Sequence, residues 1–178
     1  MEDNRVNSFR SFGVLAGLTR DMKIQGNIIT GGGTGASGIL LGAEALKTGS
    51  VTRNAIAGNP VGLLFAAISS VQVDSFGAAI SLNDFQGNQK AILLGGQPFN
   101  PATVSVDLSV DGRGNYWGHT CADDSANDLG FIEFGKPGAD SPSANIFDSH
   151  PYGVPVAETP DALLPMTLLG GYCAATPE

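Results

Sequence analysis

The chain has 178 residues and a formal net charge of −8, and only 15% of its side chains are charged, well below the quarter that is typical of globular domains. Its 25 glycines and 10 prolines disfavour long uninterrupted helices, which argues against helical bundles and coiled coils. Residues 1–106 hold seven basic and six acidic residues, whereas residues 107–178 hold two basic and eleven acidic residues. Neither half has a basic stripe, so we expect no nucleic-acid partner. No stretch reaches the roughly eighteen continuous apolar residues of a membrane span.

Short apolar–polar alternations that end in asparagine recur along the first two thirds of the chain. Asn27, Asn54 and Asn83 follow such alternations at spacings of 27 and 29 residues, and a looser copy lies at Asn115. One such unit cannot bury its apolar face, whereas stacked units bury alternate residues against the units above and below. The spacing therefore predicts a solenoid.

A second set of similar segments follows in each unit, at residues 38–41 (GILL), 62–65 (GLLF) and 91–94 (AILL). Two Gly-Asn steps, at residues 58–59 and 87–88, precede the later segments and are typical of turns with left-handed backbone conformations. Each unit is thus expected to run strand, turn, strand, loop.

This pattern resembles the right-handed parallel β-helix repeat family, whose coils show loosely repeated Asn-x-Ile, Gly-Asn and Gly-Ile-x-Leu steps. The resemblance extends over about residues 5–118, where residues 83–88 and 111–119 look like the last coils and closing motif of many secreted members. It implies an all-β, right-handed, single-stranded parallel β-helix of about four to five coils in residues 1–118. Residues 119–178 would form an irregular, acidic, Pro- and Gly-rich C-terminal cap and tail.

The resemblance also implies a role for the repeated asparagines. Stacked asparagine side chains form ladders at the turns of this family, and the positions that match this role are Asn27, Asn54 and Asn83. The family includes pectin-active enzymes, epimerases, periplasmic copper-maturation proteins and noncatalytic surface proteins. The fold therefore does not determine the function.

Residues 33–38 (GTGASG) match the G-x-G-x-x-G spacing of dinucleotide-binding loops. In that alternative, the strand-like residues 28–30 precede the loop and residues 39–46 form the helix that follows it. Such a site needs an acidic residue about twenty positions later for the ribose, but after Glu44 the next carboxylate is Asp74. We expect a Gly-rich loop between two β-helix strands, and a nucleotide-binding oxidoreductase is the remote alternative.

Three polar residues close to the end of the repeats are candidates for catalysis. Asp107, Asp111 and Arg113 lie on one segment, and alternation places Asp107 and Asp111 on the same strand face. Paired carboxylates beside a base are what polysaccharide hydrolysis or lyase chemistry requires. We interpret this face chiefly as solvated and keep the three residues as candidates for a polysaccharide lyase, hydrolase or epimerase.

Two aromatic residues at the end of the repeats and two cysteines are further candidates. Tyr116 and Trp117 are expected to cap the last coil, with stacking on a sugar as their alternative role. Cys121 and Cys173 allow either one disulfide or two buried thiols.

The acidic residues that follow the repeats form an oxygen-rich cluster that would suit calcium, although no recognised ligand spacing is present. The residues of this cluster are Asp123, Asp124, Asp128 and Glu133. We interpret the cluster chiefly as a solvated loop. The expectation is therefore that the protein has no cofactor, with calcium as the alternative.

These observations predict a noncatalytic extracellular or cell-surface β-helix module that is structural or binds glycans weakly. A polysaccharide-active enzyme is the alternative. No signal peptide is visible in residues 1–20. Because the repeats begin near residue 5 without a capping helix, the first coil would present an open edge. We expect upstream coils of a longer chain, or a partner in a homo-oligomer, to cover that edge.

Overall fold

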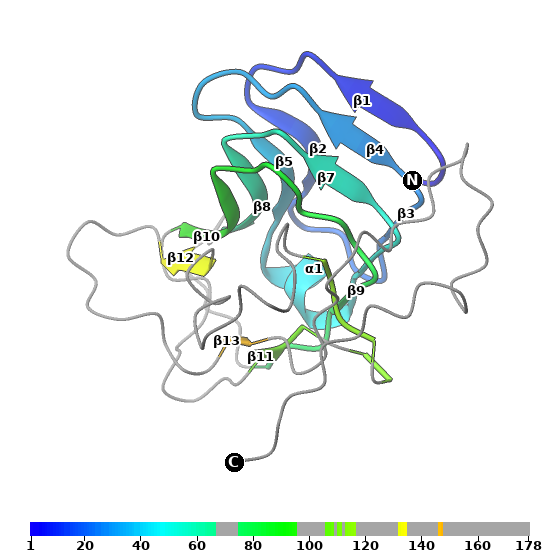
Figure 1. The fold of residues 1–178 in the computed structure, drawn as a ribbon. Helices are drawn as coiled ribbons and strands as arrows, with labels where there is room; N and C mark the ends of the chain where they lie inside the picture. The colour runs from blue at the N-terminus through cyan, green and yellow to red at the C-terminus, as the bar shows by residue number, and fades with distance from the viewer. Residues whose placement is uncertain are drawn as a thin grey trace.

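The computed structural model of the chain describes residues 1–66, 75–95, 106–108, 110–111, 113–116, 132–134 and 146–147. Its strands form three parallel sheets, each built from strands of successive coils, and one short strand pair (Figure 1). The first sheet contains β1 (Arg5–Asn7), β4 (Ile28–Thr30) and β7 (Ala55–Ala57), in that order. The second contains β2 (Phe12–Ala16), β5 (Ser37–Leu41), β8 (Val61–Ala66), β10 (Lys90–Gly95) and β12 (Ile132–Phe134). The third contains β3 (Lys23–Gln25), β6 (Ser50–Thr52) and β9 (Ala79–Ser81), and β11 (Val106–Asp107) pairs with β13 (Ile146–Phe147).

The chain visits the three sheets in turn, and each coil pairs in parallel with the next. Three complete turns are β1–β2–β3, β4–β5–β6 and β7–β8–β9, and the later strands continue the stack. The predicted parallel β-helix is therefore confirmed. The prediction of four to five coils holds only approximately, because three turns are complete and the later strands add parts of further turns.

The core lies inside the coils and is built from columns of aliphatic side chains in register. In the third sheet, Ile24, Val51 and Ile80 are paired across three coils, and all are buried. The second sheet contributes a longer column of core residues, namely Val14, Ile39, Leu63 and Ile92. Because each side chain is covered mainly by the coils above and below, no unit is stable by itself.

A column of glycines allows the coils of the second sheet to approach closely. A Cβ atom on Gly13 would lie 2.7 Å from the Gly38 carbonyl oxygen, and one on Gly38 would lie 2.8 Å from the Gly62 oxygen. A Cβ on Gly62 would in turn lie 2.7 Å from the Ala91 oxygen. These contacts are with backbone atoms, which cannot move aside easily, so a side chain at these positions would push successive coils apart.

The Gly-rich segment that resembles a dinucleotide-binding loop connects two strands. Its loop, with Gly31 and Gly35 at positive φ, joins β4 to β5, and Gly38 lies within β5. The helix α1 (Ala43–Thr48) begins only after β5 has ended. A dinucleotide site needs the glycine loop to run directly into a helix N-terminus, and this segment does not.

In the ranges that the structure describes, no helix has the length and apolar character needed to span a membrane.

Candidate functional site

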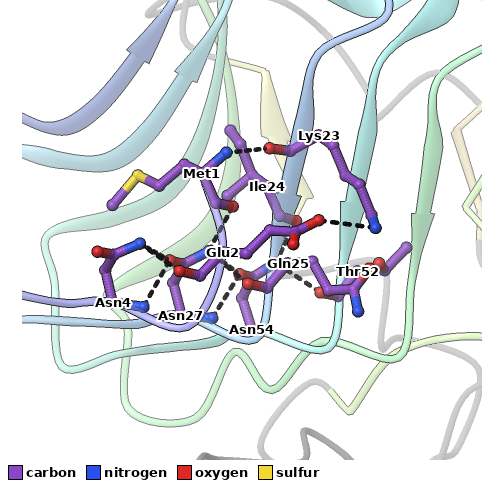
Figure 2. Close-up of polar contacts among 9 residues, drawn as sticks. All are labelled: Met1, Glu2, Asn4, Lys23, Ile24, Gln25, Asn27, Thr52 and Asn54. Carbon is purple, nitrogen blue, oxygen red and sulfur yellow. Dashed lines mark hydrogen bonds and ion pairs between the residues drawn. The ribbon is translucent and has the colours of Figure 1, made fainter.

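Five asparagines stack along the solenoid, one in each successive coil, at the turn that precedes the first sheet. The Asn27 Oδ1 accepts hydrogen bonds from Asn4 N at 3.0 Å and Asn4 Nδ2 at 3.2 Å (Figure 2). The Asn54 Oδ1 accepts from Asn27 N at 3.0 Å and Nδ2 at 2.9 Å. The same pair of bonds joins Asn54 to Asn83, and Asn83 to Asn115. We call this column the asparagine ladder.

The ladder also satisfies backbone carbonyls that would otherwise be unpaired inside the turn. The Asn54 Nδ2 donates to the Ile24 and Thr52 carbonyl oxygens, each at 3.0 Å. Asn27, Asn54 and Asn83 are fully buried. Since buried amides are costly unless they are paired, these bonds account for the residue type at each position. At Asn27, Asn54 and Asn83 the polar groups are therefore used within the protein rather than presented to a ligand.

A second, shorter stack lies between the first and second sheets. Asn59 Oδ1 accepts from Gly32 N at 3.1 Å, and Asn88 Oδ1 accepts from Asn59 N at 2.9 Å. The glycines before them, Gly58 and Gly87, have φ values of 65° and 70°. The Gly-Asn steps thus combine a left-handed turn residue with a stacking amide. Sequence reasoning recognised these steps as turns but did not predict that their amides would stack.

Two of the three catalytic candidates lie in one tight turn. Val110 and Arg113 exchange two backbone hydrogen bonds, at 2.9 and 3.0 Å, across a two-residue loop that begins with Asp111. Asp111 has a φ of 52°, and both Asp111 and Arg113 are exposed. Asp-Gly is the sequence that two-residue loops with positive φ favour, so the turn by itself explains Asp111. Asp107 lies in β11, and its side chain is outside the described residues.

Tyr116 continues the first sheet. Its N–H donates to the Asn83 carbonyl at 2.8 Å, and its own carbonyl accepts from Phe85 N at 2.8 Å. The residue is 7% exposed, which favours the expected capping role over stacking on a sugar. Several other candidates lie outside the described residues, namely Trp117, Cys121, Asp123, Asp124, Asp128 and Cys173. Of Glu133, only the backbone is described, as part of β12.

Comparison with known proteins identified one family model that matches this chain. The model is described as "Periplasmic copper-binding protein (NosD)" and matches residues 1–121. A search of curated proteins gave no match, and neither did a search of solved structures. The matched stretch contains all three complete turns and the whole asparagine ladder. The match supports the predicted extracellular or cell-surface location only in the broad sense of a compartment outside the cytoplasm.

The family description corrects the expectation about cofactors. The prediction of no cofactor, with calcium as the alternative, is wrong because the family is described as copper-binding. Copper in proteins is held by imidazole, thiolate and thioether ligands. Among the described residues no group of three or more His, Cys, Asp or Glu is placed to hold a metal ion, and Met22 is buried in the core. The described solenoid therefore does not fit a copper site.

The family match and the fold agree with each other. The match covers residues 1–121, more than half of the 178 residues. Over the same stretch the structure shows parallel coils that stack in register. The chain belongs to the NosD family of periplasmic copper-binding proteins.

Proposed function

We propose that this chain is a noncatalytic β-helix module that acts outside the cytoplasm in copper handling, with the solenoid as its scaffold. The proposal is carried by two observations together: the family match, and a stack of coils whose repeated polar feature, the asparagine ladder, is bonded internally and is buried at Asn27, Asn54, Asn83 and Asn115. A scaffold of this kind positions residues at its ends and sides without taking part in chemistry itself.

We further propose that the copper ligands come from the end of the matched stretch. His119 and Cys121 carry the only imidazole and the only thiol within residues 1–121. These two groups are among the ligands that copper prefers. Both residues lie outside the described part of the chain, so this assignment rests on their chemistry and their place in the sequence.

Removing both side chains is expected to weaken copper binding. The purified, reduced chain should bind Cu(I) in competition with a chromophoric chelator, and His119→Ala combined with Cys121→Ser should lower the affinity about tenfold or more. Cys173→Ser is the matched control for the thiol, because it makes the same cysteine-to-serine change outside the stretch that the family model matches. It should leave the Cu(I) affinity unchanged. Unchanged Cu(I) binding by the double variant would refute the ligand assignment.

The noncatalytic part of the proposal predicts that acidic polysaccharides stay intact. Incubation with the chain should produce neither new reducing ends nor unsaturated products. Asp111→Asn should leave stability unchanged within about 0.5 kcal/mol, because asparagine tolerates the positive φ of this turn. If the unaltered chain produced reducing ends or unsaturated products and Asp111→Asn did not, the result would instead support the polysaccharide-active alternative.

A further inference from the structure

The fourth coil has an insertion where the chain passes from the first sheet to the second, a connection that we call the corner. The strand pairing aligns one residue of the first sheet and one of the second in each of the last three coils. The aligned pairs are Ala55 and Leu63, Asp84 and Ile92, and Tyr116 and Ile132. The members of the first two pairs are eight residues apart in the sequence, whereas those of the third are sixteen apart. The corner of the fourth coil therefore holds eight more residues than the two corners before it.

Both ends of this insertion are held by the solenoid. At its start, the buried Asn115 accepts hydrogen bonds from Asn83 N at 3.1 Å and Asn83 Nδ2 at 2.9 Å. Tyr116, the next residue, is bonded to the coil before it through its N–H and its carbonyl. At its end, β12 pairs in parallel with β10 (Figure 1). Insertions in one repeat of a rigid stack are often the place where such proteins bind their ligands.

The residues of the enlarged corner differ in chemistry from those of the two smaller corners. Residues 56–62 (IAGNPVG) and 85–91 (FQGNQKA) contain no histidine, cysteine or carboxylate. Residues 117–131 (WGHTCADDSANDLGF) contain an imidazole, a thiol and three carboxylates. Side chains that can bind a metal ion therefore occur at this corner only in the coil where it is enlarged, which argues that the insertion serves binding rather than the stacking of coils.

The fold limits how far the proposed ligands can lie from the coils. His119 follows Tyr116 by three residues, and a chain extends by at most about 3.6 Å per residue, so its Cα lies within about 11 Å of that of Tyr116. The neighbouring corner has Gln86 and Gln89 exposed on either side of the buried Asn88. The amide of Asn88 is used internally, because its Nδ2 donates to the Ile56 carbonyl at 2.6 Å and the Phe85 carbonyl at 3.0 Å.

We propose that copper binds outside the stack of coils, on the insertion of residues 117–131, beside the exposed Gln86 of the coil before. This location accounts for the disagreement between a family described as copper-binding and a solenoid whose described residues form no metal site. The inference rests on the proposed copper role of His119 and Cys121, and it adds the place of that site in the fold.

An extra imidazole at the neighbouring corner tests this location. Gln86→His should raise the Cu(I) affinity of the reduced chain about tenfold, because the new side chain can join His119 and Cys121 as a ligand. Gln25→His is the matched control, since it makes the same change in β3 of the first coil and should leave the affinity unchanged. In the variant that lacks both His119 and Cys121, Gln86→His should give no such gain.

A shortened corner tests whether residues 117–131 are an insertion. Replacing them by the sequence of residues 85–91 gives the fourth corner the length that the third coil already uses. This variant should keep the circular dichroism spectrum and the cooperative unfolding of the unaltered chain, because the transferred sequence fits the same corner. Its Cu(I) affinity should fall about tenfold or more, as in the variant that lacks His119 and Cys121.

The outcomes separate this inference from the proposed function. If the loss of His119 and Cys121 weakens Cu(I) binding but Gln86→His and Gln25→His have equal effects, the ligands are supported and their location beside Gln86 is wrong. Loss of the β-sheet spectrum in the shortened variant would show that residues 117–131 are part of the coil and would overturn the insertion. Unchanged Cu(I) binding without His119 and Cys121 would instead refute the proposed ligands themselves.

Discussion

Replacing Asn54 by alanine is expected to lower the free energy of unfolding by about 3–5 kcal/mol. The side chain is fully buried, and its Oδ1 accepts hydrogen bonds from the N and Nδ2 of Asn27. Its Nδ2 donates to the Asn83 Oδ1 at 2.9 Å and to two backbone carbonyls. Truncation leaves several of these groups buried without partners, and each such group costs roughly 1–3 kcal/mol. Urea denaturation followed by circular dichroism measures the change.

The matched control for this variant is Asn7→Ala. Asn7 lies in β1, and its side chain is exposed, so the same change in residue type removes no buried hydrogen bond. We expect its effect to stay within about 0.5 kcal/mol. Similar losses in the two variants would mean that the asparagine ladder contributes little to stability.

Replacing Gly38 by alanine is expected to destabilise the protein by about 2–3 kcal/mol, although the residue lies within the G-x-G-x-x-G segment. The new Cβ would lie 2.8 Å from both the Gly62 oxygen and the Ile56 Cγ2 atom. Both contacts are closer than side-chain carbons tolerate, so β5 and β8 must separate or distort. Thermal and urea unfolding of the variant would show this loss.

Gly33→Ala is the control from the same segment. A Cβ there meets no atom closer than the Phe9 oxygen at 3.6 Å, and the backbone does not have positive φ. We expect unchanged stability or a gain of up to about 1 kcal/mol, because alanine restricts the unfolded chain. In a dinucleotide-binding loop the first glycine is required for the tight turn, so strong destabilisation by Gly33→Ala would contradict the β-helix interpretation.

The sequence predicted the solenoid because its signals are local and repeated. Asparagine after an apolar alternation is visible at Asn27, Asn54 and Asn83, and the structure joins these residues by hydrogen bonds. Asn4 was missed as a rung because residues 1–3 (MED) do not form the apolar–polar alternation by which the other rungs were recognised. The glycine column was also missed, since it depends on the distance between strands of different coils rather than on any local preference.

The candidate site was far less predictable. Asp107 and Asp111 were grouped by strand alternation, but the chain turns tightly at Asp111, so a two-residue period does not extend through this segment. The copper link had no signal in the repeats, because the coils use aliphatic residues, glycine and asparagine, none of which is a preferred copper ligand. The proposed ligands, His119 and Cys121, follow the repeats, and the periodicity of the coils does not predict such single positions.

The stacking of asparagines also gives the solenoid an electrical polarity. All side-chain amides of the ladder are oriented alike, with the nitrogen of each facing the oxygen of the next. Their dipoles add along the coil axis much as peptide dipoles add along a helix, and the negative end lies at Asn4. Each bond polarises its neighbours, so the central rungs are held more strongly than the terminal one. A solenoid of this kind is therefore extended favourably only by coils that keep this orientation, with donors brought to its oxygen end or acceptors to its nitrogen end.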